Sequence, residues 1–143
     1  MTPPDVTLDT TDTPGDAMLL AVDNGLEQYN HAVAPLKEVR SLASFATDAS
    51  GTVVGGAVGR TWGECCELLQ LWVAEEHRRH GLGSRLLKAF EAGARARGCR
   101  TFYLTTLSFQ APDFYRRHGY AVLASIAGYP DGIVKYLMRR DEV

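Results

Sequence analysis

The chain has 143 residues, of which 45% are hydrophobic and 22% charged, with a formal net charge of −2. This composition is ordinary for one globular domain with a single core, and it excludes a disordered or fibrous chain. No apolar run has the length of a membrane span, and the first residues lack a basic and then an apolar region. We therefore expect a cytoplasmic protein with no membrane partner.

Charge is divided unevenly along the chain. Residues 1–71 carry ten acidic and three basic side chains, whereas residues 72–143 carry seven acidic and twelve basic ones. A basic half suits a polyanionic ligand, and an acidic half suits a cationic one. Solvated helix faces would give the same counts. The overall acidity argues against nucleic acid as a partner.

The first predicted elements are a polar stretch and a helix. Residues 1–15 are rich in Thr, Pro and Asp and are expected to be flexible, with at best a short strand near residues 6–8. Asp16 is a predicted helix N-cap, and apolar residues recur at helical spacing from there to Tyr29. The pair Asn24-Gly25 is expected to weaken or split this helix.

Strands dominate the middle of the chain. Residues 41–48 and 52–62 are predicted strands joined by a turn at residues 48–51, and the next strand covers 65–74. Helices and strands then alternate, over residues 83–97, 100–107, 111–118, 120–128 and 132–140. This order indicates an α/β fold in which a mixed central sheet is flanked by helices, within a single domain over residues 1–143.

A glycine-rich turn links the strand at 65–74 to the helix that follows. Glycine lets the backbone approach a ligand closely, and the first N–H groups of a helix have no acceptor within the helix. Such a turn predicts a phosphate site. The P-loop pattern is excluded because Ser84-Arg85 follows Gly83. The dinucleotide pattern is excluded because Leu86 stands where a third small residue belongs.

The turn carries the motif Arg78-x-x-Gly81-x-Gly83. It resembles the pyrophosphate-binding motif of the GNAT superfamily of acyl-CoA-dependent N-acyltransferases. Residues 108–120 resemble the second GNAT signature, Asn-x-x-Ala-x-x-Phe-Tyr-x-x-x-Gly-Phe. The match includes the Phe-Tyr pair, but Ser108 stands at the Asn position. The resemblance runs from about residue 53 to 138 and implies the GNAT fold, with acetyl-CoA as the acyl donor.

The resemblance also implies which residues hold acetyl-CoA. Strands 65–74 and 100–107 would splay apart, with pantetheine between them and the Val73 N–H directed at the acyl carbonyl. Ser108 would lie near the pantetheine. Arg78 would either orient the turn or contact phosphate. The candidate backbone donors to pyrophosphate are those of Arg79, His80, Gly81, Gly83 and Ser84, with the Ser84 hydroxyl as a further donor.

Tyr115 of the second motif is the expected catalytic acid, since in this family the tyrosine protonates the departing thiolate. A phenol with an ordinary pKa of about 10 is protonated at neutral pH and can donate. Taken alone, the helical pattern favours a core aromatic, and it is the place of Tyr115 in the Phe-Tyr pair of the motif that implies the catalytic role. Glu67 is the first candidate for the base because regular alternation along its strand places it with Leu71 and Val73.

The predicted activity is transfer of an acetyl group from acetyl-CoA to a primary amine of a small molecule or peptide, directly within a ternary complex. A protein N-acetyltransferase and a non-catalytic acyl-CoA-binding sensor are the alternatives. Homodimers are common in the family and are a further expectation. The candidate acceptor-site residues are Glu27, Tyr29, Asn30, Trp62, Tyr129 and Asp131.

No metal is expected. His77 and His80 lie in a basic loop without a carboxylate or cysteine at ligand spacing. The chain has an odd number of cysteines, Cys65, Cys66 and Cys99. Their spacing suits neither a disulfide framework nor a zinc site. They are expected to be reduced residues of strands or the core.

Overall fold

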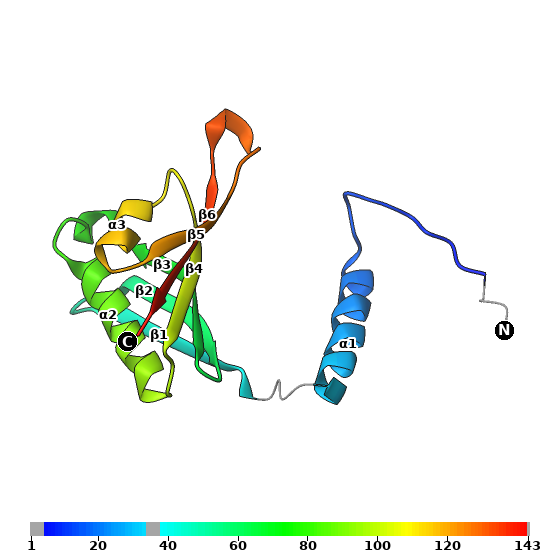
Figure 1. Ribbon diagram of the computed structural model, residues 1–143, viewed down its shortest axis with the longest axis horizontal. Coiled ribbons are helices and arrows are strands. Elements are labelled where there is room, and N and C mark those ends of the chain that lie inside the picture. Colours follow the sequence, from blue (N-terminus) through cyan, green and yellow to red (C-terminus); the bar gives the residue numbers. More distant parts are fainter. Residues whose placement is uncertain (1–4, 34–37, 143) are drawn as a thin grey trace. The chain divides into compact units, whose positions relative to one another are not determined.

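The computed structural model of the protein describes residues 5–33 and 38–142. By internal contacts the chain divides into two units, Met1–Lys37 and Glu38–Val143. The described residues of the first unit include the helix α1 (Asp16–Val33), drawn in blue in Figure 1. In the described ranges, no helix is long and apolar enough to cross a bilayer.

Helix α1 differs from its sequence prediction in two details. It continues through Asn24-Gly25 without a break, because a single interior glycine costs a helix only about 1 kcal/mol. The Gly15 carbonyl accepts the N–H of Leu19, so Gly15 and not Asp16 holds the N-cap position.

The short strand expected near residues 6–8 is absent, because residues 6–8 form no strand. The polar stretch around them offers no partner strand or apolar surface to pair with.

The second unit is built on a six-stranded sheet in the order β1-β2-β3-β4-β6-β5. Strands β3 and β4 pair in parallel, and the other four neighbouring pairs are antiparallel. The predicted mixed sheet is therefore confirmed. The strands are β1 (Arg40–Thr47), β2 (Val53–Trp62), β3 (Cys65–Val73), β4 (Thr101–Leu107), β5 (Ala121–Ile126) and β6 (Lys135–Asp141).

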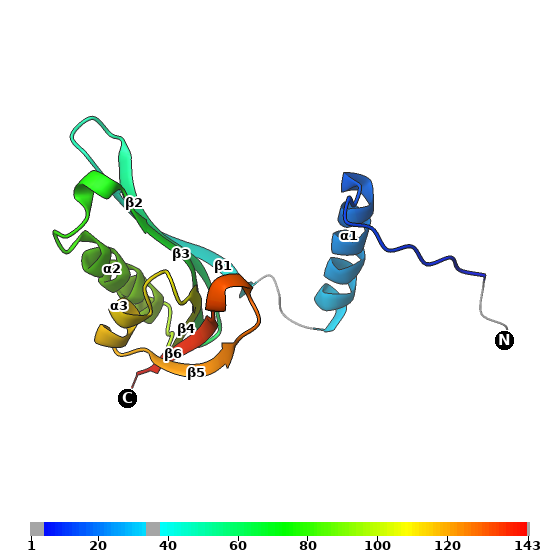
Figure 2. The ribbon, with the colours of Figure 1, turned by 90° about the horizontal axis from the view of Figure 1, so that it is seen from above.

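Two helices, α2 (Leu82–Ala96) and α3 (Pro112–Arg117), lie on one side of this sheet, as Figures 1 and 2 show. Short 3-10 turns, η2 (Glu75–His77) and η3 (Pro130–Gly132), connect β3 to α2 and β5 to β6. The apolar face of α2 forms the centre of the core because its residues Leu86, Leu87, Phe90 and Ala94 are buried. Phe102, Leu104 and Met138 from the sheet are also buried in this core.

One glycine of β2 permits a close approach of helix and sheet. A Cβ atom on Gly59 would lie 2.0 Å from the Glu67 carbonyl oxygen and 2.7 Å from the Phe90 ring. Opposite this point the β2–β3 register shifts between Val58 and Gly59, which leaves Leu69 without a partner on β2. β3 therefore carries a bulge at Leu69, which changes the face on which the following side chains lie.

Among the described residues, the core holds one buried carboxylate. Glu91 of α2 is 1% exposed. The Tyr120 hydroxyl donates to it over 2.8 Å, and Arg140 Nη1 lies 3.4 Å from its nearer oxygen. Arg140 Nη1 also donates to the carbonyl of His118, over 3.0 Å. This charged pair ties α2 to β6 and to the end of α3, because a buried carboxylate needs such partners.

Candidate active site

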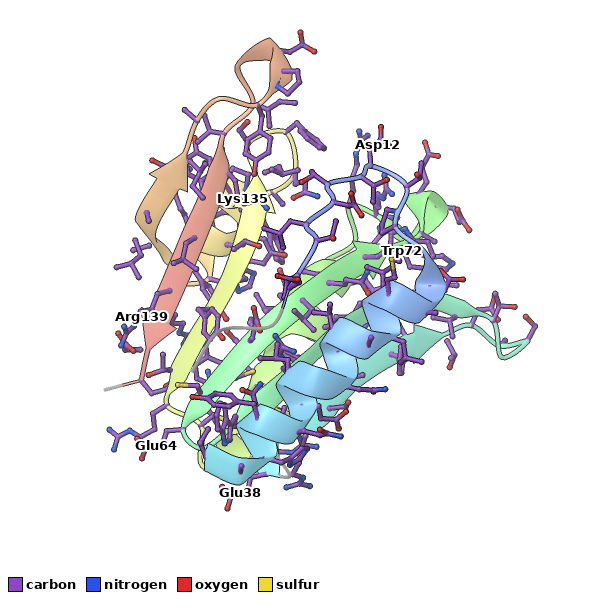
Figure 3. The ribbon with its side chains drawn as sticks, turned by 90° about the vertical axis from the view of Figure 1, so that its right-hand side faces the viewer. Asp12, Glu38, Glu64, Trp72, Lys135 and Arg139 are labelled. Carbon is purple, nitrogen blue, oxygen red and sulfur yellow. The ribbon has the colours of Figure 1, made fainter. Side chains whose placement is uncertain are left out.

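The central feature of the site is the divergence of two parallel strands. Pairing of β3 with β4 ends at Leu68 and Leu104, although β3 continues to Val73 and β4 to Leu107. The expected splay between these strands is therefore present. A cleft of about 910 Å³ lies at this point, lined by both strand ends and by Ala111 and Tyr115. Figure 3 labels Trp72 at this end of β3 and Glu64 at the other.

The glycine-rich turn lies next to this cleft. Arg79 (φ 67°) and Gly81 (φ 78°) both adopt left-handed backbone conformations. The first bond of α2 runs from Arg85 N–H to the Gly81 carbonyl, so the N–H groups of Gly83 and Ser84 have no acceptor within the helix. Consecutive free N–H groups in such a turn form an anion-binding concavity.

The turn and the cleft form one continuous depression. A second cavity of about 430 Å³ lies over the turn and shares five lining residues with the cleft: Leu71, Trp72, Val73, Arg78 and Ala111. The turn residues Arg79, Gly81, Gly83 and Ser84 line this cavity. His80 lines a different cavity, between β1 and α2. An elongated ligand with an anionic end could thus extend from the turn into the strand cleft.

Arg78 holds the turn against the strand end. Its Nε donates to the Val73 carbonyl oxygen over 2.9 Å. This bond favours the first of the two interpretations of Arg78, in which the side chain orients the turn. The guanidinium also lines both cavities, so it places a positive charge where they meet.

The two glycines of the motif have different structural requirements. Gly81 needs the left-handed conformation that side chains disfavour. Gly83 has no such need, since a Cβ there would lie 3.7 Å from the Phe114 ring and 3.8 Å from Val73, which are ordinary contacts. The fold therefore tolerates a small side chain at Gly83, and the absence of one leaves its backbone open to the cavity.

The hydroxyls of both candidate serines already have protein partners. Ser84 Oγ lies 2.9 Å from His118 Nε2. Ser108 Oγ accepts the N–H of Val134 over 3.0 Å, and the Ser108 N–H donates to the Val134 carbonyl over 2.8 Å. Ser108 thus joins the end of β4 to the segment before β6, and it is not among the lining residues of the cleft.

Tyr115 lines the cleft and lies between two aromatic rings. Phe114 and Tyr120 contact it edge to face, with ring centroids at 5.2 and 5.9 Å. Burial raises the pKa of Tyr115 to about 12, so its phenol is protonated at neutral pH. The Tyr120 hydroxyl is bound to Glu91, whereas that of Tyr115 makes no hydrogen bond to the described residues.

Glu67 does not meet Tyr115. The bulge at Leu69 interrupts the alternation, so Leu68 and Leu71 both pack on the core and Glu67 does not share a face with Leu71. The Glu67 carboxylate is paired with Arg60 Nη2 at 2.9 Å, and Glu67 is not among the lining residues of the cleft. The described residues that line the cleft include neither a carboxylate nor a histidine.

We expect Glu67→Gln to retain most of the wild-type kcat. The substitution removes one partner of a partly exposed ion pair, which contributes about 0–1 kcal/mol to stability. Steady-state kinetics and a thermal melt of the variant test this expectation. A fall in kcat of about 100-fold with an unchanged Tm would instead identify Glu67 as the general base.

The candidate acceptor residues belong to several different elements. Trp62 pairs with Cys65, so it lies at the end of β3 remote from the cleft. Tyr129 and Asp131 lie on the connection from β5 to β6, where Lys135 Nζ stands 5.8 Å from the Tyr129 ring centroid. The other three, Glu27, Tyr29 and Asn30, belong to α1 in the first unit.

The cleft has further lining residues that the sequence analysis did not single out. Phe45, Thr105, Thr106 and Gln110 are among them. The Gln110 side chain accepts the Leu107 N–H over 2.7 Å and so fixes the loop after β4. A motif search misses such residues because they line the cleft only through their position where β3 and β4 separate, which no local motif encodes.

In residues 5–33 and 38–142, no three His, Cys, Asp or Glu side chains gather as a metal site. We expect full activity after dialysis against excess chelator, since the backbone donors of the turn can hold an anion without a cation. Activity assays with and without chelator test this. A loss that zinc or magnesium restores would contradict it.

The fold and the site together define a class of protein. A mixed sheet whose parallel strands splay beside a glycine-rich turn at a helix start is the arrangement implied by the two motifs. The comparisons agree, because residues 16–120 match the Acetyltransferase (GNAT) family. The chain belongs to this GNAT acetyltransferase family and is an acyltransferase.

Individual relatives support the assignment. Blasticidin-S acetyltransferase of Streptomyces morookaense is 41% identical over 111 residues, which is 75% of this chain and 82% of the relative. An acetyltransferase of Agrobacterium fabrum is 30% identical over 112 residues, covering 78% and 82% of the two chains. The crystal structure of an acetyltransferase from Bacillus cereus superposes with a TM-score of 0.77 at 26% identity, covering 93% of this chain and 97% of that one.

Proposed function

We propose that the protein is an N-acetyltransferase that transfers an acetyl group from acetyl-CoA to a primary amine of a small molecule or peptide. The observation that carries this proposal is the continuous depression from the glycine-rich turn to Tyr115. Its turn end offers N–H donors to a pyrophosphate, and its strand end offers an unpaired β3 edge to an amide-containing arm. Acetyl-CoA has both groups in this order.

Direct transfer needs few protein groups. The neutral amine nitrogen attacks the thioester carbon, the C–S bond breaks, and the amine releases a proton to water. We assign the Val73 N–H to the developing oxyanion and the Tyr115 hydroxyl to the sulfur, which takes up the phenolic proton as it leaves. A proton from water, equivalent to the one that the amine released, then restores the Tyr115 phenol, and the products are the N-acetyl amine and free CoA.

A covalent acetyl-cysteine step is not part of this proposal. Cys66 and Cys99 are buried, and burial raises the pKa of the Cys66 thiol to about 12, so it has little thiolate character. Cys65 is exposed, but it pairs with Trp62 at the end of β3 remote from the cleft. The thiols are therefore unsuited to receive an acyl group from a donor bound there.

The first acceptor to test is suggested by the relative named for blasticidin S. The cleft residues Phe45 and Trp72 would contact the apolar body of an acceptor, and Gln70 and Gln110 offer amide groups to its polar atoms. The proposal is that the acceptors are compact amines with an apolar body and polar groups.

The deciding experiment is a screen of amines that follows free thiol released from acetyl-CoA by the full chain. The library contains blasticidin S, simple aliphatic and aromatic amines, and short peptides, with mass spectrometry of each product. Turnover of a small amine supports the proposal, and turnover of peptides alone identifies a protein N-acetyltransferase. Acetyl-CoA binding without turnover of any amine identifies a sensor module.

A further inference from the structure

A hydrogen bond links the phosphate-binding turn to a residue outside it. Ser84 is the third residue of α2 and lines the cavity over the turn. Its Oγ also lies 2.9 Å from Nε2 of His118, at the end of α3. The hydroxyl thus stands between a histidine ring and the space where an anion would bind.

His118 is held firmly in this place. Its ring packs against that of Phe114, with centroids 4.7 Å apart. Its carbonyl accepts a hydrogen bond from Arg140, which also contacts the buried Glu91. Both the ring and the backbone of His118 are therefore fixed by the core, unlike those of an ordinary surface histidine.

The chemistry of the two partners limits how they can share protons. A serine hydroxyl has one proton to donate, and phosphate oxygens at neutral pH act mainly as acceptors. If Ser84 donates to His118, it presents only lone pairs to the cavity, which repel an anion. If His118 Nε2–H donates to Ser84, the Ser84 proton is free for a phosphate oxygen.

We propose that His118 is a positioning residue for the coenzyme: its Nε2–H donates to Ser84 Oγ and directs the Ser84 hydroxyl proton toward the CoA pyrophosphate. This inference rests on the proposed function, because that function supplies the anion. It assigns a role to a side chain that neither family motif specifies. Binding of CoA selects the Nε2–H form of His118, and that form in turn strengthens CoA binding.

The proposal implies a pH dependence with a definite sign. Burial, the largest effect, lowers the pKa of His118 from its ordinary 6.5; the facing charges of Lys88, Arg117 and Arg140 also lower it, and Glu91 raises it. The ring is therefore neutral at pH 7. Protonation places hydrogen on both ring nitrogens, so only the favourable direction of donation is left. CoA affinity is therefore expected to rise as pH falls below about 6.5.

The test measures the Kd of dephospho-CoA by calorimetry between about pH 5.5 and 8. This probe keeps the pyrophosphate but lacks the 3′-phosphate, whose own pKa near 6 would obscure the result. We expect wild-type affinity to be roughly 10-fold tighter at the acid end, as for a hydrogen bond to a charged group. His118→Gln, which can donate without titrating, is expected to bind well with no pH dependence.

A double-mutant cycle completes the test. Ser84→Ala and His118→Leu each remove one member of the pair, and each is expected to weaken binding roughly 10-fold at the acid end. Their combination is expected to lose no more than either alone, because both act through one hydroxyl. Ring ¹⁵N NMR of His118 is expected to show the Nε2–H form with ligand bound.

Three outcomes would overturn the inference. A pH dependence that survives in His118→Gln means that a group other than His118 causes it. Additive losses in the double variant mean that the two side chains act independently. A His118 ring spectrum unchanged by ligand means that the bond is only structural. Failure of the wild-type protein to bind either CoA or dephospho-CoA would instead reject the proposed function, and this inference with it.

Discussion

Replacing Gly83 by valine is expected to abolish acetyl-CoA binding in a protein that stays folded. A Cβ at this position meets only ordinary contacts with Phe114 and Val73, so the fold accepts it. The branched side chain would instead occupy the cavity over the turn and keep a pyrophosphate from the backbone N–H groups. We expect calorimetry to show a loss of at least ~100-fold in affinity, about 2.7 kcal/mol.

The matched control is Gly93→Ala on the same helix. Its Cβ would lie 3.2 Å from the tip of the Leu42 side chain, within the core and away from the turn. This variant is expected to bind acetyl-CoA as the wild type does, with at most a small change in Tm. Equal affinities of Gly83→Val and the wild type would remove the main support for an acyl-CoA site at the turn.

The parts of the site that depend on local sequence could be predicted. The turn from Arg78 to Gly83 is recognisable because its glycines, the preceding apolar strand and the following helix are contiguous in the chain. The N–H groups left without a helical acceptor at the start of α2 then follow from helix termini in general. The mixed sheet follows from the alternation of elements along the sequence, whereas the position of β6 between β4 and β5 was not predicted.

The bulge at Leu69 could not be predicted, and it changed the interpretation of Glu67. Regular alternation along β3 places Glu67 and Leu71 on one face, whereas the bulge separates them. Its location opposite Gly59, where Phe90 approaches the sheet closely, is a matter of tertiary packing. No local sequence pattern encodes such packing.

Contacts between residues far apart in the sequence could not be predicted either. Ser84 and His118 are separated by 34 residues, and the buried Glu91 meets Tyr120 and Arg140 from two other elements. The sequence alone places the Ser84 hydroxyl and Ser108 near the coenzyme, but it does not indicate their hydrogen-bond partners in the protein, His118 and Val134. Side-chain hydrogen bonds of this kind depend on how helices and strands are juxtaposed.

Two neighbouring tyrosines allow the catalytic and structural roles of a phenol to be separated. Tyr115 lines the cleft and its hydroxyl makes no hydrogen bond to the described residues, whereas the Tyr120 hydroxyl donates to the buried Glu91. Phenylalanine at either position keeps the ring and removes only the hydroxyl. Tyr120→Phe leaves Glu91 with one donor fewer, so we expect it to lose about 1–3 kcal/mol of stability and to retain its kcat.

Tyr115→Phe is expected to show the opposite pattern. If its hydroxyl protonates the departing thiolate, loss of this general acid lowers kcat by on the order of 100-fold or more. Acetyl-CoA affinity and Tm are expected to change little, because the aromatic packing with Phe114 and Tyr120 is kept. Burial raises the pKa of Tyr115 to about 12, so the acid stays protonated throughout the working range of pH.

Paired measurements of kcat, acetyl-CoA affinity and Tm in the two variants decide the question. A catalytic Tyr115 gives a kcat loss without a Tm loss, and a structural Tyr120 gives the reverse. Near wild-type turnover in Tyr115→Phe would reject the acid role. The substitution keeps the ring and its packing and removes only the hydroxyl, so an unchanged kcat means that the hydroxyl is not needed. The proton would then have to reach the sulfur from water or from another hydroxyl that lines the cleft, such as that of Thr105 or Thr106.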